Sequence, residues 1–255
     1  MLIEKKFINL ANEETIAYIQ KGNGPEIILL LHGNMASSST MLTLIEALQD
    51  RYTVIAPDLR GFGDSSYNKS FKSLKDLAFD MLLFCDYLKL NKVHVLGWST
   101  GFGVALELAI LKPSLVKSLF SLEGMSLKGY YSIKKDAFGN EIPHTLYPSY
   151  QVMNENEGMR ALQDAINRND YEFVKNMWLK LLLVVKPISN EELDLYVKET
   201  LKERCQLDIN WCWVNFNISD EPNLYTQGNS TYHQITCPIT LTLGENDNIV
   251  VPKMI

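Results

Sequence analysis

The sequence predicts an α/β fold in which helices flank a mostly parallel sheet and a run of helices interrupts the chain between two strands. Three observations carry this prediction. Strand-like and helix-like segments alternate through the first 123 residues, which is typical of βαβ units with right-handed crossovers. Residues 27–31 are all apolar, as expected for a strand that is covered on both faces. Helical patterns dominate residues 125–234, and strand character returns only at residues 239–243.

The elements of the first part follow from local patterns. Short strands are predicted at residues 7–10 and 15–20, joined by a polar turn. Residues 37–48 carry apolar side chains at helical spacing, and a strand at residues 52–56 is expected to end at Pro57. The same patterns then predict a helix at 74–88, a strand at 92–96, a helix at 100–111 and a strand at 116–122.

The middle of the chain is predicted as a helical insertion. Helices are expected at residues 158–168, 170–185 and 190–205. The chain therefore divides into a core over residues 1–124, the insertion over residues 125–234, and a return to the core over residues 235–255. The insertion also carries aromatic side chains that could wall a pocket or pack among themselves, and these include Trp178, Trp211, Trp213 and Phe216.

Composition and charge exclude several classes of protein. Apolar residues make up 46% of the chain and charged residues 21%, which excludes a disordered, collagen-like or coiled-coil protein. Because 24 Lys and Arg stand against 30 Asp and Glu, the net charge is −6, and this acidic balance disfavours a nucleic-acid partner. The N-terminal residues are charged where a signal peptide is apolar, and no apolar run approaches the ~20 residues that span a bilayer. We therefore expect a cytoplasmic protein with no membrane partner.

The cysteines form no recognisable metal or redox motif. None belongs to a C-x-x-C pair, and none lies near a histidine at zinc-ligand spacing, so reduced, mostly structural thiols are expected. No metal is implied. The four are Cys85, Cys205, Cys212 and Cys237.

The sharpest chemical signal is the pentapeptide Gly97-Trp98-Ser99-Thr100-Gly101. It lies where a predicted strand turns into a predicted helix. A serine in such a turn adopts a strained backbone that exposes its hydroxyl, and the glycines avoid collisions with neighbouring elements. The helix N-terminus behind it favours a developing negative charge. Ser99 is therefore the candidate nucleophile.

An oxyanion hole needs two preorganised N–H donors, one from the residue after the nucleophile and one from a loop after an earlier strand. These donors are predicted to be the backbone N–H groups of Thr100 and of Asn34, which follows the strand at residues 27–31. His32 stands in the same loop, and we expect it to pack there rather than act as a base. The charged, glycine-rich loop at residues 58–65 is also expected to be structural.

Two carboxylates compete for the role of catalytic acid. Asp247 follows the strand at residues 239–243, and Glu123 follows the strand at residues 116–122. A carboxylate at the C-terminal end of a strand can orient a histidine and stabilise its imidazolium form. Asp247 is the preferred candidate, and Glu123 is the alternative.

Together these motifs resemble the α/β-hydrolase superfamily over essentially the whole chain. The matching segments are His32-Gly33-Asn34, residues 58–65, the turn around Ser99, Gly244-Glu245-Asn246-Asp247, and residues 249–252.

The resemblance implies Ser99 as nucleophile, the N–H groups of Asn34 and Thr100 as oxyanion hole, and Asp247 as acid. Some members of the superfamily place the acid after the sixth strand, where Glu123 stands. The resemblance also implies that the insertion is a helical cap over the active site, between the sixth and seventh strands. No cofactor or metal is implied.

Two departures from the superfamily pattern stand out. Many members have a second glycine after the nucleophile turn, where this sequence has Phe102. The superfamily also places its catalytic histidine well downstream of the acid, after an eighth strand, whereas only eight residues follow Asp247. We therefore expect the chain to be truncated and residues 1–255 alone to have little activity. The available histidines, none in the expected place, are His32, His94, His144 and His233.

The sequence thus predicts a serine hydrolase for a small, partly apolar carboxylic ester, lactone or thioester. A serine rather than an aspartate nucleophile disfavours dehalogenase and epoxide-hydrolase chemistry. Carbon–carbon bond hydrolysis and aminopeptidase activity are alternatives within the enzyme class. A non-catalytic ligand-binding or sensor protein on the same fold is a further alternative, which the missing histidine motivates. The expected partner is a small-molecule substrate, and the sequence does not determine the oligomeric state.

Overall fold

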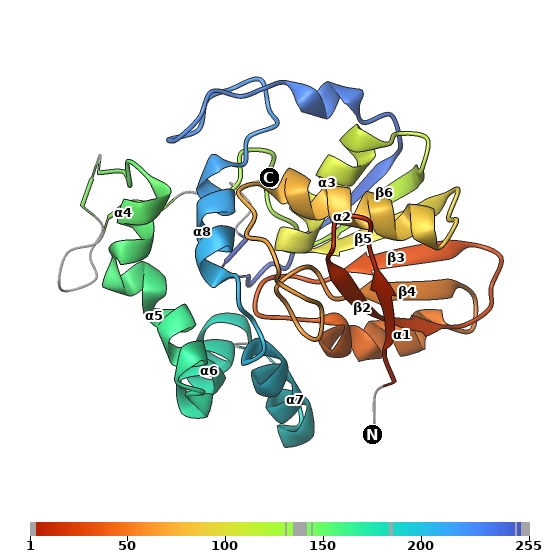
Figure 1. The fold of residues 1–255 in the computed structure, drawn as a ribbon, viewed down its shortest axis with the longest axis horizontal. Coiled ribbons are helices and arrows are strands. Elements are labelled where there is room, and N and C mark those ends of the chain that lie inside the picture. The colour runs from red at the N-terminus through yellow and green to blue at the C-terminus, as the bar shows by residue number, and fades with distance from the viewer. Residues whose placement is uncertain are drawn as a thin grey trace.

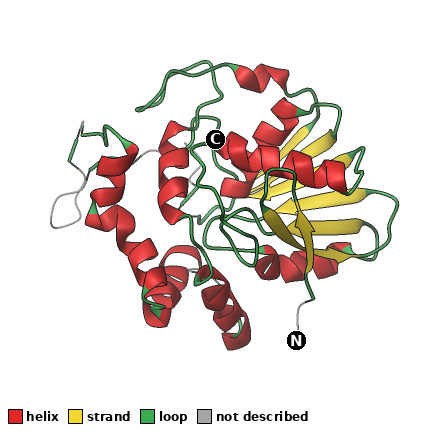
Figure 2. Ribbon diagram, in the orientation of Figure 1, coloured by secondary structure: helices red, strands yellow, loops and turns green. Residues whose placement is uncertain are grey.

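The computed structural model describes residues 4–130, 132–134, 142–143, 145–183, 186–247 and 249–250 of the 255-residue chain. Its centre is a seven-stranded sheet, and core helices cover both faces of that sheet (Figure 1; Figure 2). The strands are β1 (Lys6–Asn9), β2 (Thr15–Lys21), β3 (Ile27–Leu31), β4 (Thr53–Pro57), β5 (Val93–Trp98), β6 (Val116–Leu122) and β7 (Ile239–Thr242). The core helices are α1 (Leu42–Leu48), α2 (Leu74–Tyr87) and α3 (Thr100–Leu111).

The sheet is mostly parallel, as the sequence predicts. Its strand order is β1-β2-β4-β3-β5-β6-β7. The five strands from β4 to β7 in this order run parallel, whereas β1 and β2 pair antiparallel at one end. Parallel strands end at the same edge of a sheet, so the loops that follow β3, β5, β6 and β7 meet there. This edge collects the candidate site residues.

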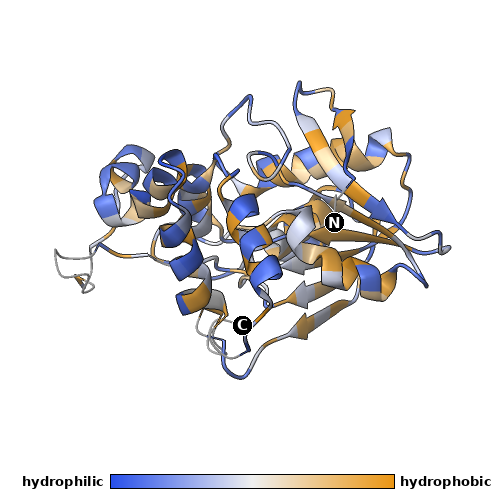
Figure 3. Cartoon of the chain, turned by 90° about the horizontal axis from the view of Figure 1, so that it is seen from below, coloured by the Kyte–Doolittle hydropathy of each residue, from blue (hydrophilic) through white to orange (hydrophobic). Residues whose placement is uncertain are grey.

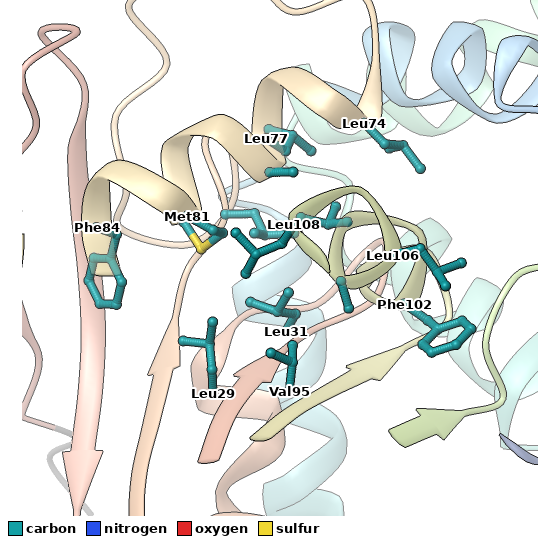
Figure 4. Close-up of a cluster of buried hydrophobic side chains, with 14 of the residues drawn as sticks. Leu29, Leu31, Leu74, Leu77, Met81, Phe84, Val95, Phe102, Leu106 and Leu108 are labelled. Atoms are coloured by element: carbon teal, nitrogen blue, oxygen red, sulfur yellow. The ribbon is translucent and has the colours of Figure 1, made fainter. Parts of the chain in front are cut away.

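The two faces of β3 show how the sheet is buried on both sides. Leu29 and Leu31 belong to the cluster formed with α2 and α3, whereas Ile28 and Leu30 pack with α1. This follows from the alternation of side chains along a strand. Figure 4 shows Leu29 and Leu31 beneath the two helices on the first face. Figure 3 shows the same concentration of hydrophobic residues on the strands. The apolar run at residues 27–31 is therefore a strand buried on both faces.

The predicted helical insertion lies between β6 and β7. Helix α8 joins it to the core, since Ile209 and Cys212 belong to the main core cluster. The more N-terminal helices of the insertion project to one side of the sheet (Figure 1). None of the helices in the described ranges is long and apolar enough to cross a lipid bilayer. The helices are α4 (Tyr150–Glu155), α5 (Glu157–Asn167), α6 (Tyr171–Met177), a π-helical turn (Trp178–Leu182), α7 (Asn190–Thr200) and α8 (Gln206–Asn215).

Several element boundaries predicted from the sequence are wrong. The single helix expected at residues 170–185 is α6 followed by a π-helical turn, and the helix expected at residues 190–205 ends at Thr200. Neither α4 nor α8 was predicted. The strand that is expected to end at Pro57 does so, with Pro57 itself as the last residue of β4, because a proline is tolerated at a strand end.

Buried ionic contacts hold the charged loop after β4, as predicted for a structural loop. The Asp58 carboxylate is fully buried and accepts hydrogen bonds from the Ser38 backbone N–H and from Lys5 Nζ, both at 2.8 Å. Arg60 Nε donates to Asp80 Oδ2 at 2.7 Å. Burying a charge costs free energy unless it is paired, and both carboxylates are paired here. These contacts tie the loop to the N-terminal strand and to α2.

Candidate active site

Ser99 lies in the sharp turn between β5 and α3, at the edge where the parallel strands end. Its backbone has φ +50° and ψ −120°, a region that residues other than glycine rarely adopt. The glycines beside it are sterically required. A Cβ on Gly97 would lie 2.5 Å from the Phe102 nitrogen, and a Cβ on Gly101 would lie 2.5 Å from the His32 carbonyl oxygen. The pentapeptide thus forms the strained strand-to-helix turn that it predicts.

The strained turn is held by the neighbouring strand as well as by α3. The Ser99 N–H donates to the Leu122 carbonyl at the end of β6, at 3.1 Å. The Ser99 carbonyl accepts hydrogen bonds from the N–H groups of Phe102 at 2.9 Å and of Met125 at 3.3 Å. The Phe102 side chain is buried in the core, so a phenylalanine is accommodated where many superfamily members have glycine.

Gly101→Ala is expected to lower the free energy of unfolding by about 1–3 kcal/mol, because the new Cβ would overlap the β3 backbone. Urea unfolding followed by circular dichroism measures the change. Gly158→Ala in α5 is the matched control, since its Cβ would approach only the Asn156 side chain, at 3.3 Å. Equal stability of the two variants would contradict the close packing of the turn on β3.

The loop after β3 packs directly against the nucleophile turn. A Cβ on Gly33 would lie 3.2 Å from the Ser99 Cβ, so glycine allows this approach. Asn34 follows in the loop, and Thr100 is the first residue of α3. Within the described part of the chain, neither the Asn34 nor the Thr100 backbone N–H donates to another protein group. Two unsatisfied donors therefore flank Ser99, beside the positive end of a helix dipole.

The two rival carboxylates lie beside each other. Glu123 Oε2 accepts a hydrogen bond from the Gly244 N–H at 2.8 Å. Asp247 Oδ1 accepts hydrogen bonds from the N–H groups of Ile249 at 2.6 Å and of Val250 at 2.9 Å. Burial, and then the neighbouring Asp247 charge, raise the pKa of the Glu123 carboxyl. Both predicted acids therefore reach the same part of the site, and the choice between them stays a prediction.

The structure places three histidines away from Ser99. His32 is fully buried, its Nε2 accepts a hydrogen bond from the Leu59 N–H at 2.9 Å, and burial lowers its pKa. His32 therefore packs in its loop, as expected. The remaining histidines have these partners: His94 Nδ1 contacts Ser118 Oγ at 2.7 Å and His233 Nε2 contacts Asp220 at 3.1 Å, while His144 lies outside the described residues.

Three side chains of the insertion also reach the site, although none of them is predicted as a site residue from the sequence. The Tyr130 hydroxyl lies 3.3 Å from Ser99 Oγ. Trp213 Nε1 donates to Thr100 Oγ1 at 2.8 Å, and Asn34 Nδ2 donates to Gln206 Oε1 at 2.8 Å. The sequence marks Trp213 as a possible pocket wall, but nothing in the local sequence singles out Tyr130 or Gln206. Only the packing of the insertion on the sheet edge brings them there.

A buried carboxyl lies beneath the loop that carries Asn34. Glu203 is 1% exposed, and neither of its oxygens accepts a hydrogen bond from the described residues. Burial raises the pKa of this carboxyl to about 8, and the nearby Met35 amide and Arg204 oppose the shift. The raised pKa favours the protonated form of Glu203 in the folded protein at neutral pH, whereas the carboxyl ionises in the unfolded chain.

This difference predicts a pH-dependent stability. A raised pKa in the folded state stabilises the fold at low pH, and that contribution is lost as pH rises from the ordinary glutamate value towards about 8. Glu203→Gln keeps the side chain neutral. The variant is expected to match the wild type near about pH 5 and to be more stable by a few kcal/mol near about pH 8. Urea unfolding at both pH values tests this, with the exposed Glu46→Gln as control. The same difference at both pH values would contradict it.

The described residues contain no group of three or more His, Cys, Asp or Glu side chains that could hold a metal ion. The described residues gather several reactive or polar groups at this edge of the sheet. These are a strained serine, two backbone donors, two adjacent carboxylates and a tyrosine hydroxyl.

The chain is similar in sequence to known hydrolases. A family model described as the alpha/beta hydrolase fold matches residues 26–255. The chain is 26% identical over 259 residues to Lipase 1 of Psychrobacter immobilis, which covers 99% of this chain and 72% of that protein. It is 35% identical over 114 residues to a soluble epoxide hydrolase of Corynebacterium sp. (strain C12), which covers 45% of this chain and 40% of that protein.

Similarity to solved structures extends over nearly the whole chain. An esterase from Exiguobacterium antarcticum superposes with a TM-score of 0.71 at 17% identity, covering 98% of this chain and 85% of that one. At this identity the likeness concerns the fold. Three of the curated relatives, in contrast, are matched over only 28–40% of their own length.

Proposed function

This chain belongs to the alpha/beta hydrolase family, and we propose that it is a serine hydrolase for small, partly apolar carboxylic esters, lactones or thioesters. The observation that carries the proposal is the strained Ser99 turn. Its hydroxyl is presented at the sheet edge, and two free N–H donors flank it. This is the arrangement that acyl transfer needs, because the nucleophile and the oxyanion donors must converge on one carbonyl group.

In the proposed reaction, Ser99 Oγ attacks the substrate carbonyl carbon while a base takes the hydroxyl proton. The carbonyl oxygen becomes an oxyanion, which the N–H groups of Asn34 and Thr100 bind. The base then returns the proton to the departing alcohol or thiol, leaving an acyl ester on Ser99. Water cleaves that ester by the same two steps, and the serine regains its proton.

The base is expected to be a histidine oriented by Asp247, with Glu123 as the alternative acid. The described histidines that contact other groups, His32, His94 and His233, do not fill this role. None of these three histidines is therefore proposed as the base. A serine nucleophile also disfavours epoxide and haloalkane hydrolysis, because the alkyl ether it would form has no carbonyl group for water to attack.

Covalent labelling of Ser99 by a fluorophosphonate probe tests the proposal. In a form of the protein that supplies the catalytic base, Ser99 is expected to take up one probe, identified by peptide mass spectrometry, and the protein is expected to hydrolyse p-nitrophenyl acetate and butyrate. Ser99→Ala is expected to lose both properties. A folded protein that the probe does not label would rule out the serine-hydrolase function.

A non-catalytic ligand-binding protein is the second candidate, and the placement of the described histidines favours it. Such a protein would bind small esters or acids at the same edge without turning them over. Calorimetric binding of butyrate or an ester, together with an absence of labelling and turnover, would distinguish it from the enzyme.

A further inference from the structure

Tyr130 is fixed against the nucleophile by contacts with α8. Its backbone N–H donates to the Trp213 carbonyl at 3.1 Å, and its ring packs edge-to-face on the Trp213 indole with centroids 5.5 Å apart. Gly129 makes this approach possible. It has φ +71°, and a Cβ there would lie 2.7 Å from the Phe216 carbonyl oxygen. The Tyr130 hydroxyl is thereby held 3.3 Å from Ser99 Oγ.

The same indole also reaches the other side of the turn. Trp213 Nε1 donates to the Thr100 Oγ1 at 2.8 Å, and Thr100 is buried. One side chain of the insertion therefore contacts both Tyr130, which touches the nucleophile, and Thr100, whose N–H is a proposed oxyanion donor. Since Trp213 lies on α8, the insertion and the nucleophile turn are connected through a single residue.

The direction of the hydrogen bond between Tyr130 and Ser99 follows from their chemistry. Burial raises the pKa of the Tyr130 hydroxyl to about 12, so the phenol keeps its proton at physiological pH and is not a base. The single Ser99 proton has to point at the base for attack to begin. The lone pairs of Ser99 Oγ are then free to accept the phenolic proton.

We propose that Tyr130 is a further catalytic residue, whose phenol O–H donates to Ser99 Oγ and stabilises the negative charge that gathers there as the serine proton leaves. Trp213 is the positioning residue, because it contacts both Tyr130 and Thr100 and fixes their positions relative to Ser99. This inference rests on the proposed function. A hydrogen bond to a charged oxygen is stronger than one to a neutral oxygen, so the contact favours the activated serine over the resting one. No proton is transferred from Tyr130 in either half of the reaction.

Tyr130→Phe tests the role, because it removes the hydroxyl and keeps the ring on Trp213. It is expected to slow fluorophosphonate labelling of Ser99, and kcat for p-nitrophenyl butyrate, by about 10- to 100-fold with little change in KM. Trp213→Phe keeps the aromatic contact but loses the bond to Thr100, and about a 3- to 10-fold loss is expected. Tyr171→Phe is the matched control, since its hydroxyl bonds Asp194 elsewhere in the insertion. Labelling of Tyr171→Phe is expected to be unchanged, and Tyr130→Phe and Tyr171→Phe should keep the wild-type melting temperature.

The outcomes separate this inference from the proposed function. Labelling of Tyr130→Phe at the wild-type rate would overturn the role of Tyr130 and leave the serine hydrolase intact. Abolished labelling, together with loss of the rise in rate with increasing pH, would make Tyr130 the base and also overturn the inference. A wild-type protein that the probe does not label would overturn the proposed function itself.

Discussion

In a form of the protein that supplies the catalytic base, replacing Ser99 with alanine is expected to lower kcat/KM for p-nitrophenyl butyrate by about 10⁴-fold or more, because the proposed acyl ester forms on Ser99. Alanine cannot attack the carbonyl, whereas the oxyanion donors and the substrate contacts remain. Initial rates at substrate concentrations below KM measure the effect. Ser70→Ala, at an exposed position, controls for loss of a serine elsewhere. Turnover that survives in Ser99→Ala would show that the activity belongs to another residue.

In a form of the protein that supplies the catalytic histidine, replacing Asp247 with asparagine is expected to cost about 10⁴-fold in kcat, far more than replacing Glu123 with glutamine. An acid that orients the catalytic histidine also stabilises its positive charge, and its loss has an effect of this size in serine proteases. Both substitutions are isosteric. The amide oxygens can still accept the hydrogen bonds from Ile249 and Val250 in the one case and from Gly244 in the other. Only the negative charge is removed.

The comparison of the two variants decides between the rival acids. Because the two carboxylates lie beside each other and the Asp247 charge helps to raise the pKa of the Glu123 carboxyl, the double variant is also expected to depart from the product of the single effects. A larger loss in Glu123→Gln than in Asp247→Asn would move the acid to the end of β6. Unchanged melting temperatures in both variants confirm that the losses reflect chemistry rather than folding.

The core of the fold was largely predictable because its signals are local. The helix at residues 100–111 and the strand at residues 116–122 were predicted with the bounds that the structure has. The apolar run of β3 and the two glycines around Ser99 carry their meaning within a few residues. Each reflects a steric or burial constraint that acts on the neighbouring chain, so the nucleophile turn could be located without the tertiary structure.

The insertion was less predictable, and α8 shows why. Its sequence, residues 206–215, places Trp211, Cys212 and Trp213 side by side, with no polar face that would indicate helical periodicity. It packs on the core with one side and toward other insertion helices with the other. A helix that is buried on several sides loses the amphipathic pattern by which helices are recognised.

By itself the sequence determined the alternating core, the nucleophile turn and its flanking glycines, and the carboxylates at two strand ends. Only the tertiary structure decided that Glu123 and Asp247 lie beside each other, and that Tyr130 touches Ser99. The first contact depends on the parallel pairing of β6 with β7 across the whole insertion, and the second on the docking of α8 at the sheet edge. Such contacts join segments that no local pattern relates, because they form only when distant apolar surfaces are buried together.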